Sequence, residues 1–375
     1  MKIVIAIDSF KGSLTSIEAA TAIKNGIKNI SDADVVIKPL ADGGEGTTRA
    51  LVDGMGGEMI SLEVTGPTGE VVNAEYGIVW QKKLAIVEVA EAAGLILFKN
   101  KTLQPLSATT FGVGEMIRDA ILKGCRKFII GLGGSATNDG GVGMLMSLGY
   151  EFLDEEGKTI KFGLQGLNDI HMINDKKVIP ELKECDFLVA CDVENSLCGE
   201  NGAIFVYGPQ KGVLQSQRYE LDRMMKHYAI KTLEFIGQDF SDKAGAGAAG
   251  GLGFAFISFL NGKLQSGIDI VIEAINLEKE VEDATYVVTG EGQLDFQTAM
   301  GKAPIGVAKI AKKHGAKVIA FAGNVTEDAR RCNEEGIDAF FSITPGVITI
   351  DEAMDSFNAR KNLELAAEQV FRLIL

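Results

Sequence analysis

Three loops in the sequence combine glycines with acidic residues, a composition suited to binding an anion together with a cation. They are residues 41–48 (ADGGEGTT), 131–141 (GLGGSATNDGG) and 289–295 (TGEGQLD). Glycine lets the backbone approach a ligand closely, and amides at a helix start bind anions. Carboxylates among the glycines can hold Mg²⁺, which neutralises phosphate oxygens. One such loop alone is most often a turn or helix cap, but three that each follow a predicted strand favour a ligand site.

Three further loops supply acids and bases at the ends of predicted elements. They are residues 8–13 (DSFKGS), 190–195 (ACDVEN) and 208–212 (GPQKG). Lys11 could pair with a phosphate or a substrate carboxylate, and Asp8 could bind a metal or accept a proton. Asp192 follows an apolar strand, where a carboxylate is either functional or the cap of the next turn. Each position is also compatible with a solvated loop residue.

Residues 245–253 (GAGAAGGLG) open an apolar helix and contain the pattern G-x-G-x-x-G. No predicted strand precedes this segment, so the dinucleotide fingerprint is weak here. The segment could cradle phosphate with its backbone amides. A tightly packed Gly/Ala helix start explains it equally well.

The second glycine loop also fits a nicotinamide-binding pattern. Gly131, Gly133 and Ala136 have the required spacing, and Asp154 follows about twenty residues later. The run at 138–141 (NDGG) would interrupt the first turns of a Rossmann helix, which counts against this interpretation. A nicotinamide-dependent dehydrogenase of a small hydroxy acid therefore stays an alternative.

The elements that must position these loops follow an alternating order at both chain ends. A short apolar strand at 2–7 leads to an amphipathic helix at 16–30, with Thr15 and Glu18 at capping-box spacing, and to a strand at 34–38. The C-terminal part predicts strands at 285–289, 317–322 and 338–343, with helices at 302–314, 326–335 and from 359. This βαβ pattern predicts a parallel sheet covered by helices.

The order of the predicted elements is different in the middle of the chain. Residues 58–80 predict a β-hairpin around the turn at 66–69 (GPTG). Further strands are expected at 84–90, 127–132 and 187–191, and helices at 110–123, 140–148 and 213–236. We therefore expect one α/β domain built from residues 1–60 plus 285–375, with a second α/β domain of residues 61–284 inserted into it.

The composition of the chain limits the kinds of binding partner that we expect. The chain has 375 residues and a formal charge of −14, with no run of Lys and Arg, which argues against binding a nucleic-acid backbone. Five scattered cysteines are typical of reduced thiols. The first apolar run stops at Asp8, too short for a signal peptide, and no uncharged run reaches the roughly 18 residues of a membrane helix. The expected location is the cytoplasm, with no membrane partner.

Six phrases of the sequence, in order, resemble the bacterial glycerate kinase family of the type-1 kind. They are DSFKGS at 8–13, ADGGEGT at 41–47, GGSATNDGG at 133–141, GPQKG at 208–212, GAGAAGG at 245–251 and TGEG at 289–292. The resemblance runs from residue 3 to about 324. It implies two α/β domains, with the one from both chain ends Rossmann- or RNase-H-like and the inserted one flavodoxin-like. It also implies that ATP and Mg²⁺ are used to phosphorylate D-glycerate. We expect the site to lie in a cleft between the two domains.

The matched phrases, together with loop residues after the predicted strands at 187–191 and 285–289, supply site candidates rather than settled roles. Those for catalysis are Asp8, Lys11, Asp192 and Lys302. Those for binding substrate or nucleotide are Ser9, Gly43, Gly44, Gly133, Gly134, Ser135, Asn138, Asp139, Lys211, Gly245, Gly247, Gly290 and Thr298. Those for the metal are Asp42, Glu291 and Asp295. Phosphoryl transfer needs positioning and charge neutralisation, which suits such acid- and glycine-rich loops.

Within this interpretation, amides of the Gly133 and Gly245 loops would cradle the triphosphate, and Asp8 or Asp192 would take the substrate hydroxyl proton. Lys11, Lys211 and Lys302 are candidates to clamp the phosphoryl group or the glycerate carboxylate. The family leans to 2-phosphoglycerate over 3-phosphoglycerate. A non-catalytic sugar-acid binding protein stays a second alternative, and a homo-oligomer is left open.

Overall fold

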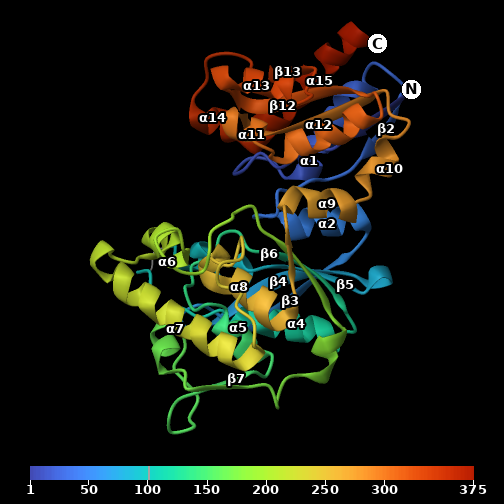
Figure 1. Cartoon of the computed structure of the whole chain (residues 1–375). Coiled ribbons are helices and arrows are strands. Elements are labelled where there is room, and N and C mark those ends of the chain that lie inside the picture. Colours follow the sequence, from blue (N-terminus) through green and yellow to red (C-terminus); the bar gives the residue numbers. More distant parts are fainter. Residues whose placement is uncertain (100–101) are drawn as a thin grey trace. The chain divides into compact units, whose positions relative to one another are not determined.

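The structure, a computed structural model, describes residues 1–99 and 102–375, and its contacts divide the chain into two compact units. Unit 1 comprises Met1–Asp42, Arg49–Gly56 and Ile268–Leu375, and unit 2 comprises Gly43–Thr48 and Gly57–Gly267. Figure 1 shows both, coloured along the sequence. The sequence placed residues 268–284 in the inserted domain, whereas these residues cluster with unit 1. The domain boundaries expected from the sequence stay a prediction.

Unit 1 contains a five-stranded parallel sheet in the order β13-β12-β11-β1-β2. Its strands are β1 (Lys2–Ile5), β2 (Asp34–Ile37), β11 (Tyr286–Leu294), β12 (Lys317–Val325) and β13 (Ala339–Ser342). Its helices are α1 (Ser16–Lys28), α2 (Thr47–Met55), α9 (Gly267–Ala274), α10 (Leu277–Val281), α11 (Phe296–Ala299), α12 (Ala303–Lys313), α13 (Arg331–Glu334), α14 (Ile350–Met354) and α15 (Ser356–Ile374). A buried strand such as β1 reads as a continuous apolar run because both sheet faces are covered.

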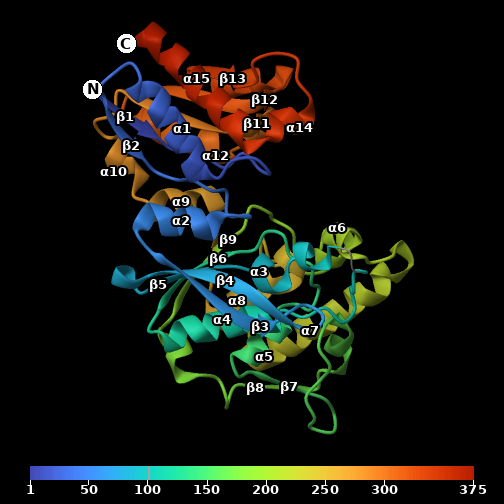
Figure 2. The ribbon, with the colours of Figure 1, turned by 180° about the vertical axis from the view of Figure 1, so that it is seen from behind.

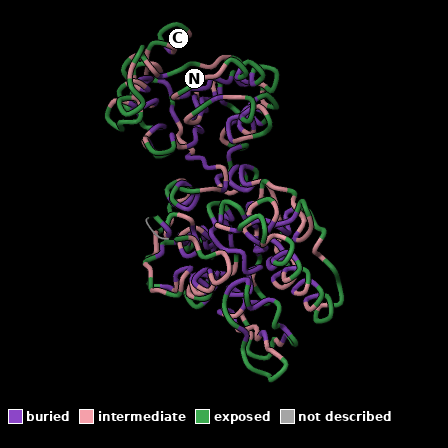
Figure 3. Tube along the Cα trace, turned by 90° about the vertical axis from the view of Figure 1, so that its left-hand side faces the viewer, coloured by how far each residue is buried: buried purple, intermediate pink, exposed green. Residues whose placement is uncertain are grey.

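Helices α1 and α15 pack together over one face of this sheet, and α12 lies on the other, as Figures 1 and 2 show from opposite sides. The capping box predicted at Thr15 and Glu18 is confirmed at the start of α1. The central strands β1, β11 and β12 are mostly buried, whereas the edge strands β2 and β13 are more exposed. Figure 3 shows how buried and exposed residues are distributed along the chain. The strand ends therefore occupy fixed positions.

Unit 2 contains a mixed six-stranded sheet in the order β10-β9-β6-β5-β4-β3. Its strands are β3 (Glu58–Thr65), β4 (Val71–Val79), β5 (Leu84–Glu88), β6 (Lys127–Gly131), β9 (Asp186–Ala190) and β10 (Lys263–Gln265). A separate two-stranded antiparallel sheet is formed by β7 (Glu151–Leu153) and β8 (Met172–Asn174). Its helices are α3 (Ala90–Ala93), α4 (Phe111–Leu122), α5 (Val142–Ser147), α6 (Ala203–Tyr207), α7 (Arg218–Ile236) and α8 (Ala248–Leu260). The predicted hairpin at 58–80 is confirmed by β3 and β4, which pair antiparallel.

The predicted α/β class with two parts is confirmed, but the topology corrects one detail. Numbered within unit 1, its strand order is 2-1-3-4-5, the flavodoxin-like order. The resemblance had given that label to the inserted part, whose sheet instead carries the antiparallel strands β3 and β4. Strand lengths and apolar patterns could not reveal this, because strand order depends on which edges pair after folding.

Candidate active site

In unit 1 the chain leaves β1 towards β2 on one side, while β11 pairs on the other side of β1. Such a switch in direction opens a crevice at the carboxyl ends of the two strands. Asp8 follows β1, and its amide donates to the carbonyl oxygen of Gly290 on β11 at 3.0 Å. Glu291 is the next residue of β11. Residues far apart in the sequence, Asp8 and Glu291, therefore meet at one edge of the sheet.

Asp8 is buried, with 6% of its surface exposed. Its carboxylate accepts a hydrogen bond from the Ser9 amide at 2.6 Å. Burial, and the nearby carboxylates of Asp42 and Glu291, raise the pKa of Asp8 to about 7, although the Ser9 amide and Lys11 oppose the rise. An acid with a pKa near neutrality can exchange a proton at physiological pH, which is the property of a general base.

Two lysines accompany these acids. The Lys11 ammonium lies 3.6 Å from an Asp42 carboxylate oxygen, and the Lys302 ammonium lies 3.9 Å from a Glu291 carboxylate oxygen. Thr298 donates its hydroxyl to Glu291 at 2.6 Å and so orients that carboxylate. Burial raises the pKa of Glu291, with Thr298 and Lys302 opposing it. Positively and negatively charged side chains therefore lie close together at the carboxyl ends of these strands.

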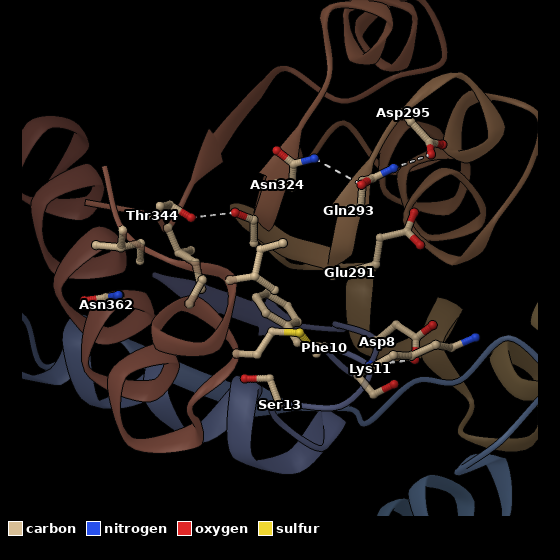
Figure 4. Close-up of a pocket in the computed structure, with 18 of the residues that line it drawn as sticks. Asp8, Phe10, Lys11, Ser13, Glu291, Gln293, Asp295, Asn324, Thr344 and Asn362 are labelled. Atoms are coloured by element: carbon tan, nitrogen blue, oxygen red, sulfur yellow. Dashed lines mark hydrogen bonds between the residues drawn. The ribbon is translucent and has the colours of Figure 1, made fainter. Parts of the chain in front are cut away.

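These residues line a pocket of about 780 Å³ within unit 1. Figure 4 shows Asp8, Lys11 and Glu291 at one end and Thr344 with Asn362 at the other, with Phe10 between them. A pocket of roughly 300–1,000 Å³ is the usual size for a ligand as large as a nucleotide. The crevice at the strand ends is therefore large enough for more than a small acid.

Asp295, which the sequence offered as a metal ligand, is the N-cap of α11. Its carboxylate accepts from the amides of Gln297 at 2.9 Å and Thr298 at 3.1 Å. Burial acts to raise the pKa of Asp295, but hydrogen bonds from the Gln293 side chain and the Thr298 amide outweigh it and hold the pKa below its usual value. Much of its hydrogen-bonding capacity therefore serves the helix start.

Gly290 has a positive φ of 152° and lies on β11 directly beside β12. A Cβ added there would be 1.9 Å from the carbonyl oxygen of Phe321. No side chain fits at that distance, so the glycine is required for the close approach of the two strands. Its neighbour Glu291 is thereby brought to the crevice.

In unit 2 the second glycine loop is organised from inside by Asp139. This carboxylate, 1% exposed, accepts from the amide and hydroxyl of Thr110 and from the amides of Gly141 and Gly143, at 2.8 to 3.2 Å. Burial raises the pKa of Asp139, while these bonds oppose the rise. The amides of Gly141 and Gly143 are therefore bound to the protein's own carboxylate and are not available to a phosphate.

Lys211 is also buried, with 1% exposed, at the end of a short 3₁₀ turn (Pro209–Lys211). Its ammonium donates to the Ser135 hydroxyl and to the Thr137 carbonyl, both at 2.8 Å. Burial lowers the pKa of Lys211 to about 7, although Asp139 acts to raise it. Lys211 therefore fixes the course of the loop 135–137.

Asn138 lies in the same loop and is fully buried. Among the residues that the structure describes, neither its side-chain nitrogen nor its side-chain oxygen has a hydrogen-bond partner, and the same holds for the hydroxyl of Thr137. Buried polar atoms without partners cost free energy unless a water or a ligand satisfies them. Asn138 stays a candidate for ligand binding together with Gly133 and Gly134.

The Gly245 loop packs tightly against other backbone. A Cβ on Gly245 would lie 2.5 Å from a Leu264 side-chain carbon, and one on Gly247 would lie 2.2 Å from the Ser196 carbonyl oxygen. The Gly247 amide donates to the Asn195 carbonyl. These contacts account for the glycines by close packing, the second of the two interpretations that the sequence left open.

The part of the first glycine loop that belongs to unit 2, residues 43–48, is held by a residue that the sequence analysis missed. Glu88, at the end of β5 and 6% exposed, accepts from the amides of Thr48 at 2.7 Å and Gly46 at 3.2 Å. Burial raises the pKa of Glu88, with the Thr48 bond opposing. A signal was present, because Glu88 lies near the carboxyl end of the predicted strand 84–90, and Asp8 and Asp192 directly follow their predicted strands.

Three other candidates of unit 2 have packing or hydrogen-bonding duties. A Cβ on Gly43, where φ is 89°, would lie 2.9 Å from the Ala190 side chain, and a Cβ on Gly133 would lie 3.1 Å from Gly44 Cα. The Asp192 carboxylate accepts from the amide of Gly267 at 3.0 Å. The structure therefore gathers the candidates into two groups, one in each unit.

Comparison with known proteins decides the family. The model described as the Glycerate kinase family matches residues 3–375. The chain belongs to the glycerate kinase family. It is accordingly a kinase, an enzyme that transfers a phosphoryl group from a nucleotide.

Individual members of the glycerate kinase family are similar over almost the whole chain. The glycerate 2-kinase of Escherichia coli is 47% identical over 354 residues, covering 94% of this chain and 93% of the relative. The glycerate kinase of Halalkalibacterium halodurans is 44% identical, covering 98% and 97%. A crystal structure described as a putative glycerate kinase 2 from Salmonella typhimurium LT2 superposes with a TM-score of 0.92 at 43% identity, covering 100% of this chain and 98% of that one.

The dehydrogenase alternative loses its structural basis in this glycerate kinase family member. A Rossmann fingerprint needs a helix that begins directly after the glycines and turns its first amides to the pyrophosphate. Here α5 begins only at Val142, and the amides of Gly141 and Gly143 are bound to Asp139.

In the part of the chain that the structure describes, no helix is both long and apolar enough to cross a membrane.

Proposed function

We propose that the chain transfers the terminal phosphoryl group of ATP to D-glycerate, giving 2-phosphoglycerate in preference to 3-phosphoglycerate. The observation that carries this proposal is the buried Asp8, with a pKa of about 7, beside two lysine–carboxylate pairs in the pocket of unit 1. Membership of the glycerate kinase family and the name of the Escherichia coli relative support the substrate and the site of phosphorylation.

Asp8 is the base in this proposal. Transfer passes through a loose transition state, so the proton of the attacking hydroxyl leaves late and needs an acceptor within hydrogen-bond reach. Asp8 faces the pocket and has a pKa at which it can accept a proton. Asp192, the other candidate, uses a carboxylate oxygen to hold the Gly267 amide. We therefore assign the proton to Asp8 and a backbone-anchoring role to Asp192.

Lys11 and Lys302 neutralise negative charge on the transferring group. Lys11 is two-thirds exposed in its side chain and Lys302 is 40% exposed, so both can swing from their carboxylate partners to a phosphate oxygen. A lysine acts on phosphate as a mobile point charge. The Ser9 amide, which holds Asp8, keeps that carboxylate in place.

Asp42 and Glu291 fit a magnesium ion as its protein ligands. Mg²⁺ is usually bound by one or two carboxylates plus substrate phosphates and waters rather than by a complete protein cage. Among the described residues no group of three or more acids, histidines or cysteines is close enough to form such a cage. When bound, the metal would neutralise phosphate oxygens, and Thr298 would keep Glu291 oriented towards it.

The candidates in unit 2 have more limited parts in this proposal. Gly133, Gly134 and Asn138 are kept as ligand-binding positions, because the polar atoms of Asn138 lack partners among the described residues. Ser135, Lys211 and Asp139 shape the loop that carries them. The prediction that both groups of residues face a single cleft stays a prediction of the sequence.

The test is a direct assay with product identification. Purified protein is incubated with ATP, Mg²⁺ and D-glycerate, and phosphorus NMR identifies the product. We expect the resonance of 2-phosphoglycerate, dependent on Mg²⁺ and absent with L-glycerate or after addition of a chelator. A product resonance at 3-phosphoglycerate would overturn the choice of hydroxyl. No phosphoglycerate at all, or reduction of added NAD with a hydroxy acid, would overturn the proposed function.

A further inference from the structure

The pocket of unit 1 has two chemically different ends. The end at β1 and β11 carries the charged side chains Asp8, Lys11 and Glu291, whereas the opposite end is lined by residues without charge (Figure 4). The uncharged lining comes from the segments that follow β1 and β13, from the end of β12, and from α14 with the segment leading into it. It includes Phe10, Asn324, Ile343, Thr344, Ile348 and Met354.

The uncharged end is too large and too apolar for the acceptor. A three-carbon hydroxy acid is polar at every carbon and fills a small part of a cavity of about 780 Å³. Such a molecule has no surface to bury against Ile343, Ile350 or Met354. Ile350 and Met354 nevertheless leave 77% and 44% of their surfaces exposed at the rim. Apolar side chains left uncovered on a pocket wall favour a ligand with an apolar face.

We infer that the uncharged end holds the nucleoside of the phosphoryl donor, with its planar base against the isoleucines and Met354 and its phosphates directed towards Lys11 and Lys302. This inference rests on the proposed function for the position of the phosphates. A nucleobase has apolar faces and polar edges, so it matches a wall of aliphatic carbons with a few polar groups. The thioether of Met354 packs adaptably on aromatic rings.

Asn324 and Thr344 are placed to hydrogen-bond the edges of the nucleoside. The Asn324 amide donates to the Gln293 side chain at 3.0 Å, and the Thr344 hydroxyl donates to the Gly323 carbonyl at 2.7 Å. These bonds fix the orientation of both groups at the pocket wall, and their acceptor oxygens can receive further bonds. The nucleoside is neutral and needs no countercharge at the uncharged end, whereas Lys11 and Lys302 neutralise the phosphates at the charged end.

The experiment measures ADP and inorganic tripolyphosphate binding by calorimetry, without glycerate, in three variants. Ala353→Trp fills the uncharged end, since Ala353 lines the pocket. Ile350→Asp places a charge at the rim, and Val347→Asp is its matched control. Val347 is a fully exposed apolar residue in the same segment and does not line the pocket. An acid at the first position of α14 suits that helix start, so Ile350→Asp is expected to fold.

We expect Ala353→Trp and Ile350→Asp to weaken ADP binding about tenfold or more, and Val347→Asp to change it less than about twofold. Ala353→Trp should leave tripolyphosphate binding within about twofold, because that ligand needs only the charged end. Unchanged ADP binding in Ala353→Trp, or equal weakening of ADP and tripolyphosphate, would overturn the inference. If Ala353→Trp does not fold, the comparison of Ile350→Asp with Val347→Asp decides.

The outcome is separable from that of the proposed function. Wild-type protein that phosphorylates D-glycerate while its ADP affinity is insensitive to these substitutions would overturn only the nucleoside position. Wild-type protein that binds ADP in the expected manner yet forms no phosphoglycerate would overturn only the proposed reaction.

Discussion

Two buried aspartates, Asp8 in unit 1 and Asp139 in unit 2, begin from the same chemistry and end in different roles. Burial raises the pKa of both. Asp139 is surrounded by donors from Thr110, Gly141 and Gly143, which satisfy its oxygens. Asp8 accepts from the Ser9 amide and borders a large pocket with three other acids and two lysines. A carboxylate whose oxygens are saturated by its own backbone shapes a loop, whereas one that faces a pocket can react.

Among the substitutions that test the different roles of Asp8 and Asp139, the largest effect is expected on kcat when Asp8 is replaced. Asp8→Asn should lower kcat by about 10²–10⁴-fold, because the variant cannot accept the proton. Asp192→Asn is the matched control and should leave kcat within about threefold, because its carboxylate anchors backbone. Steady-state kinetics measures both. A large loss in Asp192→Asn with little loss in Asp8→Asn would exchange the two assignments.

The pH dependence of stability and of kcat/KM tests the same role of Asp8. Because its pKa is raised from 3.8 to about 7, the folded chain binds a proton that the unfolded chain has released between these pH values. Asp8 therefore lowers stability as pH rises through this interval, and Asp8→Asn should remove that loss. In wild type, kcat/KM should fall about tenfold per pH unit below pH 7, since the base is then protonated. A flat profile between pH 5 and 7 would contradict this role.

For Asp139 the expected effect is on stability. Asp139→Ala leaves the donors of Thr110, Gly141 and Gly143 buried without an acceptor, which should cost about 3 kcal/mol of unfolding free energy. Glu155→Ala, at an exposed acid of the same unit, should stay within about 0.5 kcal/mol. Urea denaturation measures both. A stable Asp139→Ala variant that has lost only activity would place Asp139 among the reacting groups.

Lys211 is expected to have a smaller effect on the free energy of unfolding. Its dependence on pH has the opposite sign to that of Asp8. Burial lowers its pKa from 10.5 to about 7, so between these values the unfolded chain carries a proton that the folded chain lacks. Stability contributed by Lys211 should therefore rise from pH 7 towards pH 10. Lys211→Met should remove this slope, as seen in the difference between wild-type and variant unfolding free energies at several pH values. An identical slope in both proteins would show that Lys211 stays charged when folded.

The smallest effect separates capping from metal binding at Asp295. Asp295→Asn keeps a good N-cap and removes the charge, whereas Asp295→Ala loses the cap at a cost of about 1 kcal/mol. If Asp295 only caps α11, the Asn variant should keep the wild-type Mg²⁺ concentration for half-maximal rate within about twofold. A large increase in that concentration for both variants would make Asp295 a ligand of the metal.

Local sequence determined most elements and several of their ends. The apolar run before Asp8, the Thr15–Glu18 box and the turn at 66–69 each specify structure through contacts between near neighbours. The same local logic placed acids and glycines after predicted strands, which is why Asp8 and Glu291 were candidates from the sequence alone. The short strands β7, β8 and β10 were missed because three residues give too short a pattern.

Only the tertiary structure decided which of these residues come into contact. It also decided which of their polar atoms are already hydrogen-bonded within the protein. Strand order put Asp8 beside Glu291 and gave unit 1 its flavodoxin-like sheet, because pairing between distant edges leaves no periodic trace in the sequence. The number of donors around each carboxylate distinguished Asp8 from Asp139, and the close approach of other backbone explains the glycines of the Gly245 loop by packing. Residue type fixes what chemistry a side chain can perform, whereas the local dielectric and the available donors decide whether it performs it.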